Sequence, residues 1–266
     1  MSTFDIGIPC GNNSDFYVAF LLENMAKTLE SKKEDTRIIL GINNYRQFDL
    51  SVLDPWRDRF NIEHHYVDTD TPPGSVGHAM VLEFLLDQMT GPYGAFVDCD
   101  IGFLERGWDL IMIGELNKGT NTEAFGLEYT NAKKYQGFPN LIVCAFRPAY
   151  VKNLKIDLRP LLDPPNSQYV VQTELEARAW NSQIGRTVVL DCGFRFPLKM
   201  IESGATGKVI PFVGTGVLGV GQEHHYDGRP FLTHLKGSSV KDRNDHGANT
   251  WMKAVRKELI RLEELK

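Results

Sequence analysis

The first hundred residues alternate short apolar runs with helical patterns, and this alternation constrains the fold more than any other feature. The apolar runs end at polar loops, and they cover residues 4–9, 37–42, 62–67 and 95–97. Helical spacing of apolar residues follows Asn13 or Ser14, either of which can cap the helix, and follows Ser75, a second expected cap. This order predicts an α/β fold of Rossmann-like type, with a mostly parallel central sheet flanked by helices. Ligands of such folds bind at the carboxyl ends of the strands.

The second half of the chain is less regular. We expect strands at 125–129, 141–146 and 187–190, and a helix at 173–182. A glycine-rich region follows, in which residues 214–221 predict a loop that donor binding orders. The last element is an amphipathic helix at 250–265.

Composition excludes several classes of protein. The 266 residues, 42% of them hydrophobic, are enough to bury a substantial core. The net charge of −5 argues against general attraction to nucleic acid or to anionic membrane, although it leaves nucleic acid open as an acceptor. We expect a cytoplasmic protein, because the sequence shows no signal peptide, no membrane-spanning apolar run and four scattered cysteines without a CxxC pair.

Asp98 and Asp100 carry the strongest chemical signal, because they directly follow the apolar run 95–97. Along an extended backbone, residues i and i+2 point the same way, so the two carboxylates can project together. Neighbouring carboxylates at the end of a buried strand repel each other unless a cation lies between them. Mg²⁺ or Mn²⁺ binds such oxygens and can bind a diphosphate as well. A solvated acidic turn is the alternative, but the position after a fourth strand favours a metal site.

Four segments, in this order and spacing, resemble glycosyltransferases of the GT-A fold, particularly the family-2-like group. They are FDIGIPCGNNSDF, PGSVGHAMVLEFLLDQMTGPYGAFVDCD, TELEARAW and HLKGSS, which together span residues 4–239. The resemblance implies one GT-A-like catalytic domain over 1–266, with a nucleotide-sugar-binding half at 1–105 and an acceptor-facing half at 106–266. It also implies that Asp98 and Asp100 match the DxD motif of the family, with Asp100 the more direct metal ligand.

The resemblance also implies which residues bind the donor. They lie in the loops after the first two strands, at the start of the second helix, in the DxD motif and near the end of the chain. The implied residues are Pro9, Cys10, Gly11, Asn12, Asn43, Gly74, Ser75, His78, Asp98, Lys236 and Ser238. The acid that the family usually carries near the base is replaced here by Asn43-Asn44, which leaves the nucleotide undetermined. We favour a UDP-sugar, with a GDP-sugar as the alternative.

Glu174 is the implied catalytic base, because it precedes Arg178 as an acid does in this superfamily. An inverting enzyme needs a carboxylate that accepts the proton of the acceptor hydroxyl. The acidic pair of the family is incomplete, since Gln172 occupies one matching position, and Glu176 competes for the role. The alternative is a helix start whose acids only complement the helix dipole.

His234 is the third implied metal ligand, because a histidine before Gly-Ser-Ser returns to the metal or the diphosphate in similar enzymes. An imidazole ligand favours Mn²⁺ over Mg²⁺, whereas the alternative is a packed or surface histidine. The histidine pairs at 64–65 and 224–225 lack the i, i+4 spacing of a helical zinc site, so we expect them at the surface. Trp108 either packs in the core or lines the acceptor side.

Together these features predict a Mn²⁺- or Mg²⁺-dependent glycosyltransferase that moves a sugar from a nucleotide-diphosphate donor to an acceptor that the sequence does not identify. A nucleotidyltransferase acting on sugar phosphates is one alternative, but it would carry a basic, glycine-rich loop after the first strand, and residues 10–13 contain no Lys or Arg. A non-catalytic nucleotide-sugar- or glycan-binding module is the other. The sequence leaves inverting and retaining outcomes open.

Overall fold

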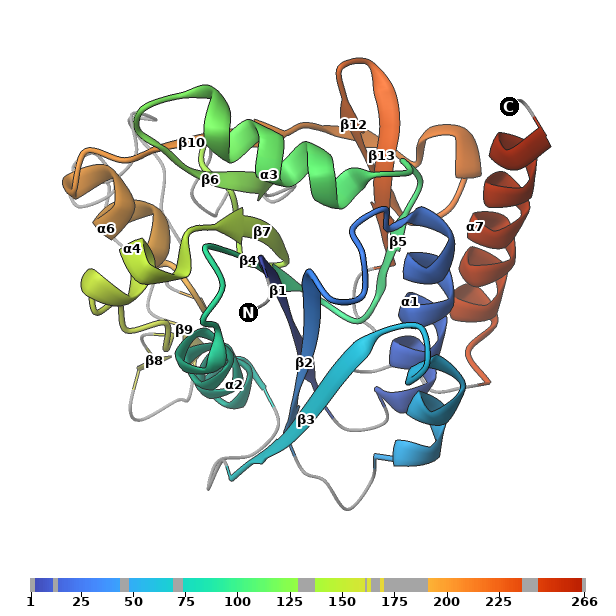
Figure 1. Ribbon diagram of the computed structural model, residues 1–266, viewed down its shortest axis with the longest axis horizontal. Coiled ribbons are helices and arrows are strands. Elements are labelled where there is room, and N and C mark those ends of the chain that lie inside the picture. Colours follow the sequence, from blue (N-terminus) through green and yellow to red (C-terminus); the bar gives the residue numbers. More distant parts are fainter. Residues whose placement is uncertain are drawn as a thin grey trace.

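The centre of the molecule is a seven-stranded sheet with the order β10-β6-β7-β4-β1-β2-β3 (Figure 1). This computed structural model describes residues 3–11, 14–43, 48–68, 74–128, 137–160, 162–163, 168–169, 191–235 and 244–264. The strands of the central sheet are β1 (Phe4–Cys10), β2 (Thr36–Asn43), β3 (Asn61–Val67), β4 (Tyr93–Val97), β6 (Thr122–Leu127), β7 (Val143–Phe146) and β10 (Thr206–Ile210). Within this sheet β7 is antiparallel to both its neighbours and the other pairs are parallel, which confirms the predicted α/β fold class.

Helices cover both faces of the central sheet. They are α1 (Asp15–Thr28), α2 (Ser75–Gln88), α3 (Trp108–Lys118), α4 (Pro148–Asn153), α6 (Arg195–Glu202) and α7 (His246–Glu264), with short 3-10 helices η2 (Leu50–Trp56) and η3 (Gly216–Leu218). Alternate residues of β4 enter different cores, because successive strand side chains point to opposite faces. Ala95 and Val97 pack with residues of α1 and α3, whereas Phe96 packs with residues of α2.

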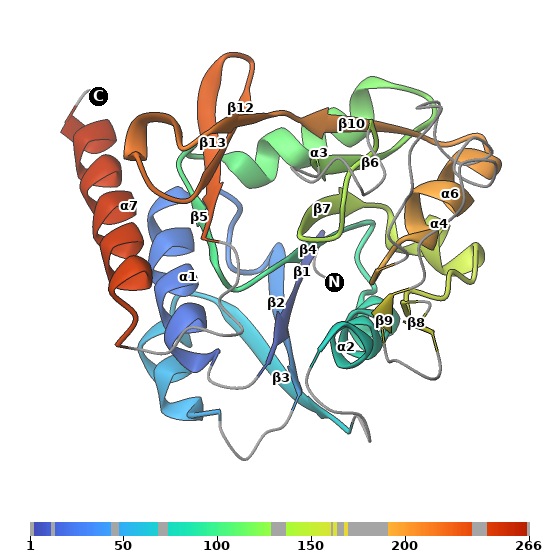
Figure 2. The same cartoon turned by 180° about the vertical axis from the view of Figure 1, so that it is seen from behind.

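A second, four-stranded sheet lies beside the first, with the order β11-β12-β13-β5. Its strands are β5 (Ile101–Phe103), β11 (Phe212–Gly214), β12 (Gln222–Tyr226) and β13 (Arg229–His234), and β8 (Leu162–Asp163) pairs separately with β9 (Gln168–Tyr169). The C-terminal helix α7 packs on this second sheet and beside α1 (Figure 2). Trp251 of α7 donates a hydrogen bond from Nε1 to Thr233 Oγ1 over 3.2 Å. Because β4 belongs to the central sheet and β5 to the second sheet, the chain passes from one sheet to the other at residues 98–100.

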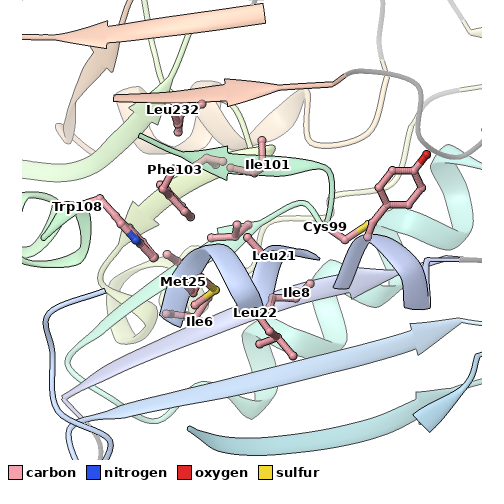
Figure 3. Packing of buried hydrophobic residues seen from close by; sticks show 14 of the residues in the cluster. Ile6, Ile8, Leu21, Leu22, Met25, Cys99, Ile101, Phe103, Trp108 and Leu232 are labelled. Atoms are coloured by element: carbon pink, nitrogen blue, oxygen red, sulfur yellow. The ribbon is translucent and has the colours of Figure 1, made fainter. Parts of the chain in front are cut away.

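The core at this passage includes Trp108, which the sequence leaves between packing and acceptor binding. Trp108 is fully buried, and its ring stacks on Phe103 with centroids 3.7 Å apart and an interplanar angle of 2°. Ile101 and Leu232 lie in the same cluster (Figure 3). Trp108 is thus a packing residue that supports β5.

Most elements of the first half match the predictions. The four expected strands are present as β1 to β4, each extended by one or two residues, and α7 begins earlier than expected at His246. The capping predictions hold in part, because Ser14 occupies the N-cap position of α1, whereas Asn13 lies outside the described residues. Ser14 Oγ donates to Gly11 O over 2.7 Å and caps no helical N–H, while Ser75 is the first residue of α2 and Gly74 precedes it.

Two further expectations concern the second half. The predicted loop at 214–221 is wrong in part, because it contains the end of β11 and the whole of η3. The predicted helix at 173–182 and strand at 187–190 lie outside the described residues. In the part of the chain that the structure describes, no helix has the length and apolar character needed to cross a membrane.

A buried ion pair fixes the amino end of the central sheet. The Asp5 side chain has no solvent exposure, and its carboxylate accepts hydrogen bonds from Arg37 Nη2 at 3.0 Å and from the backbone N–H groups of Thr90 at 2.6 Å and Gly91 at 2.8 Å. One side chain thereby connects β1, β2 and the turn that leads into β4. Charged groups are tolerated in such a place only when hydrogen bonds and an opposite charge compensate for lost hydration.

We predict that Asp5→Ala lowers the free energy of unfolding by about 3–5 kcal/mol, because it removes the buried carboxylate that compensates the Arg37 charge and accepts two backbone N–H groups. Urea unfolding at pH 7 measures this change. Asp54→Ala is the matched control, since Asp54 pairs with Arg57 in an exposed position, and we expect it to cost less than about 1 kcal/mol. Equal losses in the two variants would refute the role of Asp5.

Candidate metal centre and donor site

Asp98 and Asp100 lie where the chain leaves the central sheet and enters the second one. The Asp98 N–H donates to Ile142 O over 2.8 Å, which continues the β4–β7 pairing by one residue. The Leu235 N–H donates to Asp100 O over 3.0 Å, which continues the β5–β13 pairing. Each aspartate backbone is therefore held by a different sheet.

His234 is brought to the two aspartates by strand register. It is the last residue of β13 and pairs with Ile101, the residue directly after Asp100. His234 Nε2 lies 3.3 Å from Asp100 Oδ1, and both side chains are buried, with 9% and 5% exposure. The ligand atoms of Asp98, Asp100 and His234 all lie within 4.8 Å of one another. The structure thus brings together the three residues predicted as metal ligands.

The chemistry of this donor set fits a divalent cation. Two carboxylates in a largely buried position favour a positive charge between them, because burial and mutual repulsion both penalise two ionised groups. Two carboxylates and one imidazole suit Mn²⁺, and Mg²⁺ takes the carboxylates as well. Among the described residues, Asp98, Asp100 and His234 form the group of His, Cys, Asp or Glu side chains whose ligand atoms lie close enough together to hold one metal ion.

Helix α2 adds a second feature to the same edge. Its first turn contains His78, whose Nε2 lies 3.7 Å from Asp98 Oδ1. The N-terminus of a helix carries backbone N–H groups and a partial positive charge, which both favour a phosphate. Gly74 and Ser75, also predicted in the donor site, lie at this helix start. His78 of the predicted donor site is therefore a neighbour of the metal-ligand residue Asp98.

The other predicted donor residues lie at the ends of β1 and β2. Pro9 and Cys10 end β1, Gly11 follows in an exposed position, and Asn43 ends β2. The Cys10 thiol is buried and donates to Ile8 O over 3.5 Å, and burial raises the pKa of this thiol. Its side chain therefore belongs to the core, which leaves its backbone for a ligand.

Several predicted site residues lie outside the described residues. They are Asn12, Lys236 and Ser238 of the donor set, the implied base Glu174 and its competitor Glu176.

His224 corrects one of the surface predictions. It is 1% exposed, whereas His64, His65 and His225 are partly exposed. Its Nδ1 lies 3.2 Å from Ile210 O, so this nitrogen carries the proton that the carbonyl accepts. Burial lowers the pKa of His224 to about 4, so the ring is neutral at pH 7. A histidine inside a strand of the second sheet gives no periodic signal that distinguishes it from an exposed one, so its burial is not evident from the sequence.

Comparison with known proteins gives no match to a family model or to a curated sequence. Solved structures similar to part of the chain are GT-A-type glycosyltransferases, the class that the sequence resembles. TarS from S. aureus with UDP-GlcNAc has a TM-score of 0.45 and 16% identity, over 59% of this chain and 48% of that one. The mannosyltransferase PcManGT from Pyrobaculum calidifontis, with GDP-Man and Mn²⁺, has a TM-score of 0.45 and 11% identity, over 57% and 46%.

Glucosyl-3-phosphoglycerate synthase from Mycobacterium tuberculosis, with Mn²⁺, UDP and glucosyl-3-phosphoglycerate, has a TM-score of 0.41 and 10% identity, over 60% of each chain. The chain thus covers 46% to 60% of the length of these three structures. Likenesses of this degree establish no activity. The fold is defined by the strand order of the chain itself.

The low pKa of His224 gives a prediction about stability and pH. The pKa of His224 is about 6.5 in the unfolded chain and about 4 in the folded protein. The unfolded chain therefore gains a proton first as the pH falls, and the contribution of the neutral ring to the free energy of unfolding is complete only above pH 6.5. That stability is lost as pH falls from 6.5 toward 4, by about 1.4 kcal/mol per pH unit within the window. We predict that His224→Phe flattens this part of the profile.

The measurement is the free energy of urea unfolding between pH 4.5 and 7.5, in EDTA, for wild type and His224→Phe. The difference between the two proteins isolates His224, because all other titrating groups are shared. Parallel profiles for the two proteins would contradict a buried neutral His224.

Proposed function

We propose that this protein is a glycosyltransferase that transfers a sugar from a nucleotide-diphosphate donor and uses a divalent cation. The observation that carries the proposal is the convergence of Asp98, Asp100 and His234 at the carboxyl end of β4, within 4.8 Å of one another. This is the edge of a parallel sheet at which α/β proteins bind ligands. The sequence resemblance to GT-A glycosyltransferases supports the same reading.

Each group at this edge has a defined role in the proposal. Asp98, Asp100 and His234 hold Mn²⁺ or Mg²⁺, with Mn²⁺ favoured by the imidazole. The cation, when bound, neutralises charge that develops on the departing diphosphate. The N-terminal turn of α2 orients the diphosphate through backbone N–H groups, and His78 lies beside Asp98 on that path. In this proposal residues 1–105 bind the donor and residues 106–266 bind the acceptor.

The donor nucleotide and the base are the finer parts of the proposal. We favour a UDP-sugar over a GDP-sugar. Glu174 is the base that the sequence resemblance implies, with Glu176 as its competitor.

A thermal-shift panel tests the proposal, with UDP, GDP, CDP, dTDP and ADP each measured in Mn²⁺, Mg²⁺ or EDTA. A ligand at ~100 times its dissociation constant that binds only the folded state stabilises it by about 2.7 kcal/mol. We expect stabilisation by one nucleoside diphosphate, present with metal and absent in EDTA. No response to any nucleotide in metal would refute the proposal. Metal-dependent binding of a donor sugar without any turnover would instead support a non-catalytic binding module.

We predict that Asp100→Asn abolishes the metal-dependent part of the UDP response while the protein stays folded. Loss of a residue that merely supports a metal ligand costs about 10–100-fold in affinity, and loss of a ligand should cost at least as much. Titration of UDP in Mn²⁺, followed by calorimetry, measures this affinity. Asp58→Asn is the control, because Asp58 is an exposed aspartate far along the chain from the site. Unchanged affinity in Asp100→Asn would remove the metal assignment.

A further inference from the structure

The strand register places Glu128 at the same level of the central sheet as Asp98. Cys144 of β7 pairs with Phe96 on one side and with Gly126 on the other. Asp98 follows Phe96 by two residues, and Glu128 follows Gly126 by two residues. Because strand side chains alternate between the faces of a sheet, the two carboxylates leave the sheet on the same face. Both lie at carboxyl ends, Asp98 after β4 and Glu128 after β6.

The distance between these two positions follows from sheet geometry. One strand, β7, lies between β4 and β6, so the two Cα atoms are roughly 10 Å apart at the usual spacing of neighbouring strands. Both backbones remain hydrogen-bonded to neighbouring segments beyond the last paired residues. Asp98 N donates to Ile142 O over 2.8 Å, and Glu128 N donates to Ile210 O over 3.2 Å. Glu128 therefore lies near the metal ligands without belonging to them.

The Ile210 carbonyl connects Glu128 to the second sheet. It accepts both the Glu128 N–H and the Nδ1–H of His224, each over 3.2 Å. His224 pairs with Leu232 on β13, two residues before His234, so the His224 and His234 side chains lie on the same face of the second sheet. Glu128 at the end of the central sheet and His234 at the end of the second sheet therefore lie around the same region of the molecule, because Ile210 and His224 connect the two sheets there.

The Glu128 carboxylate is suitable for accepting a proton. Its side chain is partly exposed, and Oε1 accepts the Gly137 N–H over 3.3 Å. An ionised carboxylate has about four lone-pair sites on two oxygens, so one such hydrogen bond leaves others for a substrate. A donor held through its diphosphate at Asp98 and Asp100 presents its sugar beside the metal centre. A base for the acceptor has to lie beyond that sugar, which the separation of about 10 Å from Asp98 allows.

We propose that Glu128 is the general base of the transfer, a proposal that rests on the proposed glycosyltransferase function. The acceptor is a hydroxyl compound. Its oxygen forms a bond to the anomeric carbon, and its proton moves to the Glu128 carboxylate. The bond between the anomeric carbon and the diphosphate oxygen breaks, and the diphosphate leaves with the electron pair. Attack from the side opposite the diphosphate inverts the anomeric configuration, and the role of base moves from Glu174 to Glu128.

The test uses the full chain, UDP-sugars as donors and water as the acceptor, with UDP release measured by chromatography. Glu128→Gln keeps the size of the side chain and removes the base, so we expect UDP release to fall by about 10²–10⁴-fold. The affinity for UDP with Mn²⁺ should stay within about twofold of wild type, because Glu128 is not a donor or metal ligand. The control is Glu123→Gln, which removes a carboxylate from the amino end of the same strand, where Glu123 pairs with Arg147. Glu174→Gln and Glu176→Gln are measured in parallel.

Azide provides a readout that a merely structural role would not produce. Azide attacks an anomeric carbon without first losing a proton, so it should restore UDP release in Glu128→Ala and give a glycosyl azide. Release within threefold of wild type in Glu128→Gln, or a loss that azide does not restore, overturns the assignment. A loss confined to Glu174→Gln or Glu176→Gln overturns it as well. Wild-type protein that binds no nucleoside diphosphate with metal would instead refute the proposed function.

Discussion

The pairing of β13 with β5 is the constraint on which the candidate site depends. Asp98 and Asp100 are close in sequence and would project together after any strand that ends at this point. His234 is 134 positions further along than Asp100, and it reaches the aspartates because the β5–β13 ladder ends with the Leu235 N–H on Asp100 O. A slip of one residue would turn the His234 side chain to the opposite face of the sheet. The register of one strand pair therefore decides whether three ligands converge.

Buried carboxylates have different hydrogen-bonding and charge partners at the two ends of the central sheet. At the amino end, Asp5 is buried with Arg37 and with two backbone N–H groups, so its charge is compensated within the protein. At the carboxyl end, Asp98 and Asp100 face each other and two histidines, His234 and His78. Two carboxylates this close together repel each other, and a cation between them relieves that repulsion. We infer that the carboxyl end gains stability from a bound cation, in keeping with the general coupling of metal binding to folding.

The sequence predicted the first half of the fold well, because its strands are local apolar runs separated by helices with clear periodicity. Val97 and the aspartates after it were found from the same local pattern. The second sheet was not predicted, since β11 and β12 lie in a glycine-rich region and gain their stability from pairing with each other and, through β13, with β5. His224 was placed at the surface for the same reason, as burial in this sheet follows from long-range pairing.

Glu128 illustrates what sequence reasoning lacks at a site of this kind. It follows an ordinary strand in a polar segment, and its level relative to Asp98 appears only when both strands are aligned on Cys144 of β7. His234, by contrast, was found through its resemblance to a family position, which supplied the long-range information that periodicity does not contain. Side chains at strand ends were thus identified as polar from sequence, but their grouping required the register.

Electron–nuclear double resonance of Mn²⁺ bound to the protein in the presence of UDP tests the metal centre most directly. If Asp98, Asp100 and His234 hold the ion beside the diphosphate, the spectrum contains a ¹⁴N coupling from a coordinated imidazole and ³¹P couplings from UDP. The ¹⁴N coupling should disappear in His234→Gln. A spectrum of Mn²⁺ that lacks both the nitrogen and the phosphorus couplings in the wild-type protein would contradict a metal centre at this junction of the two sheets.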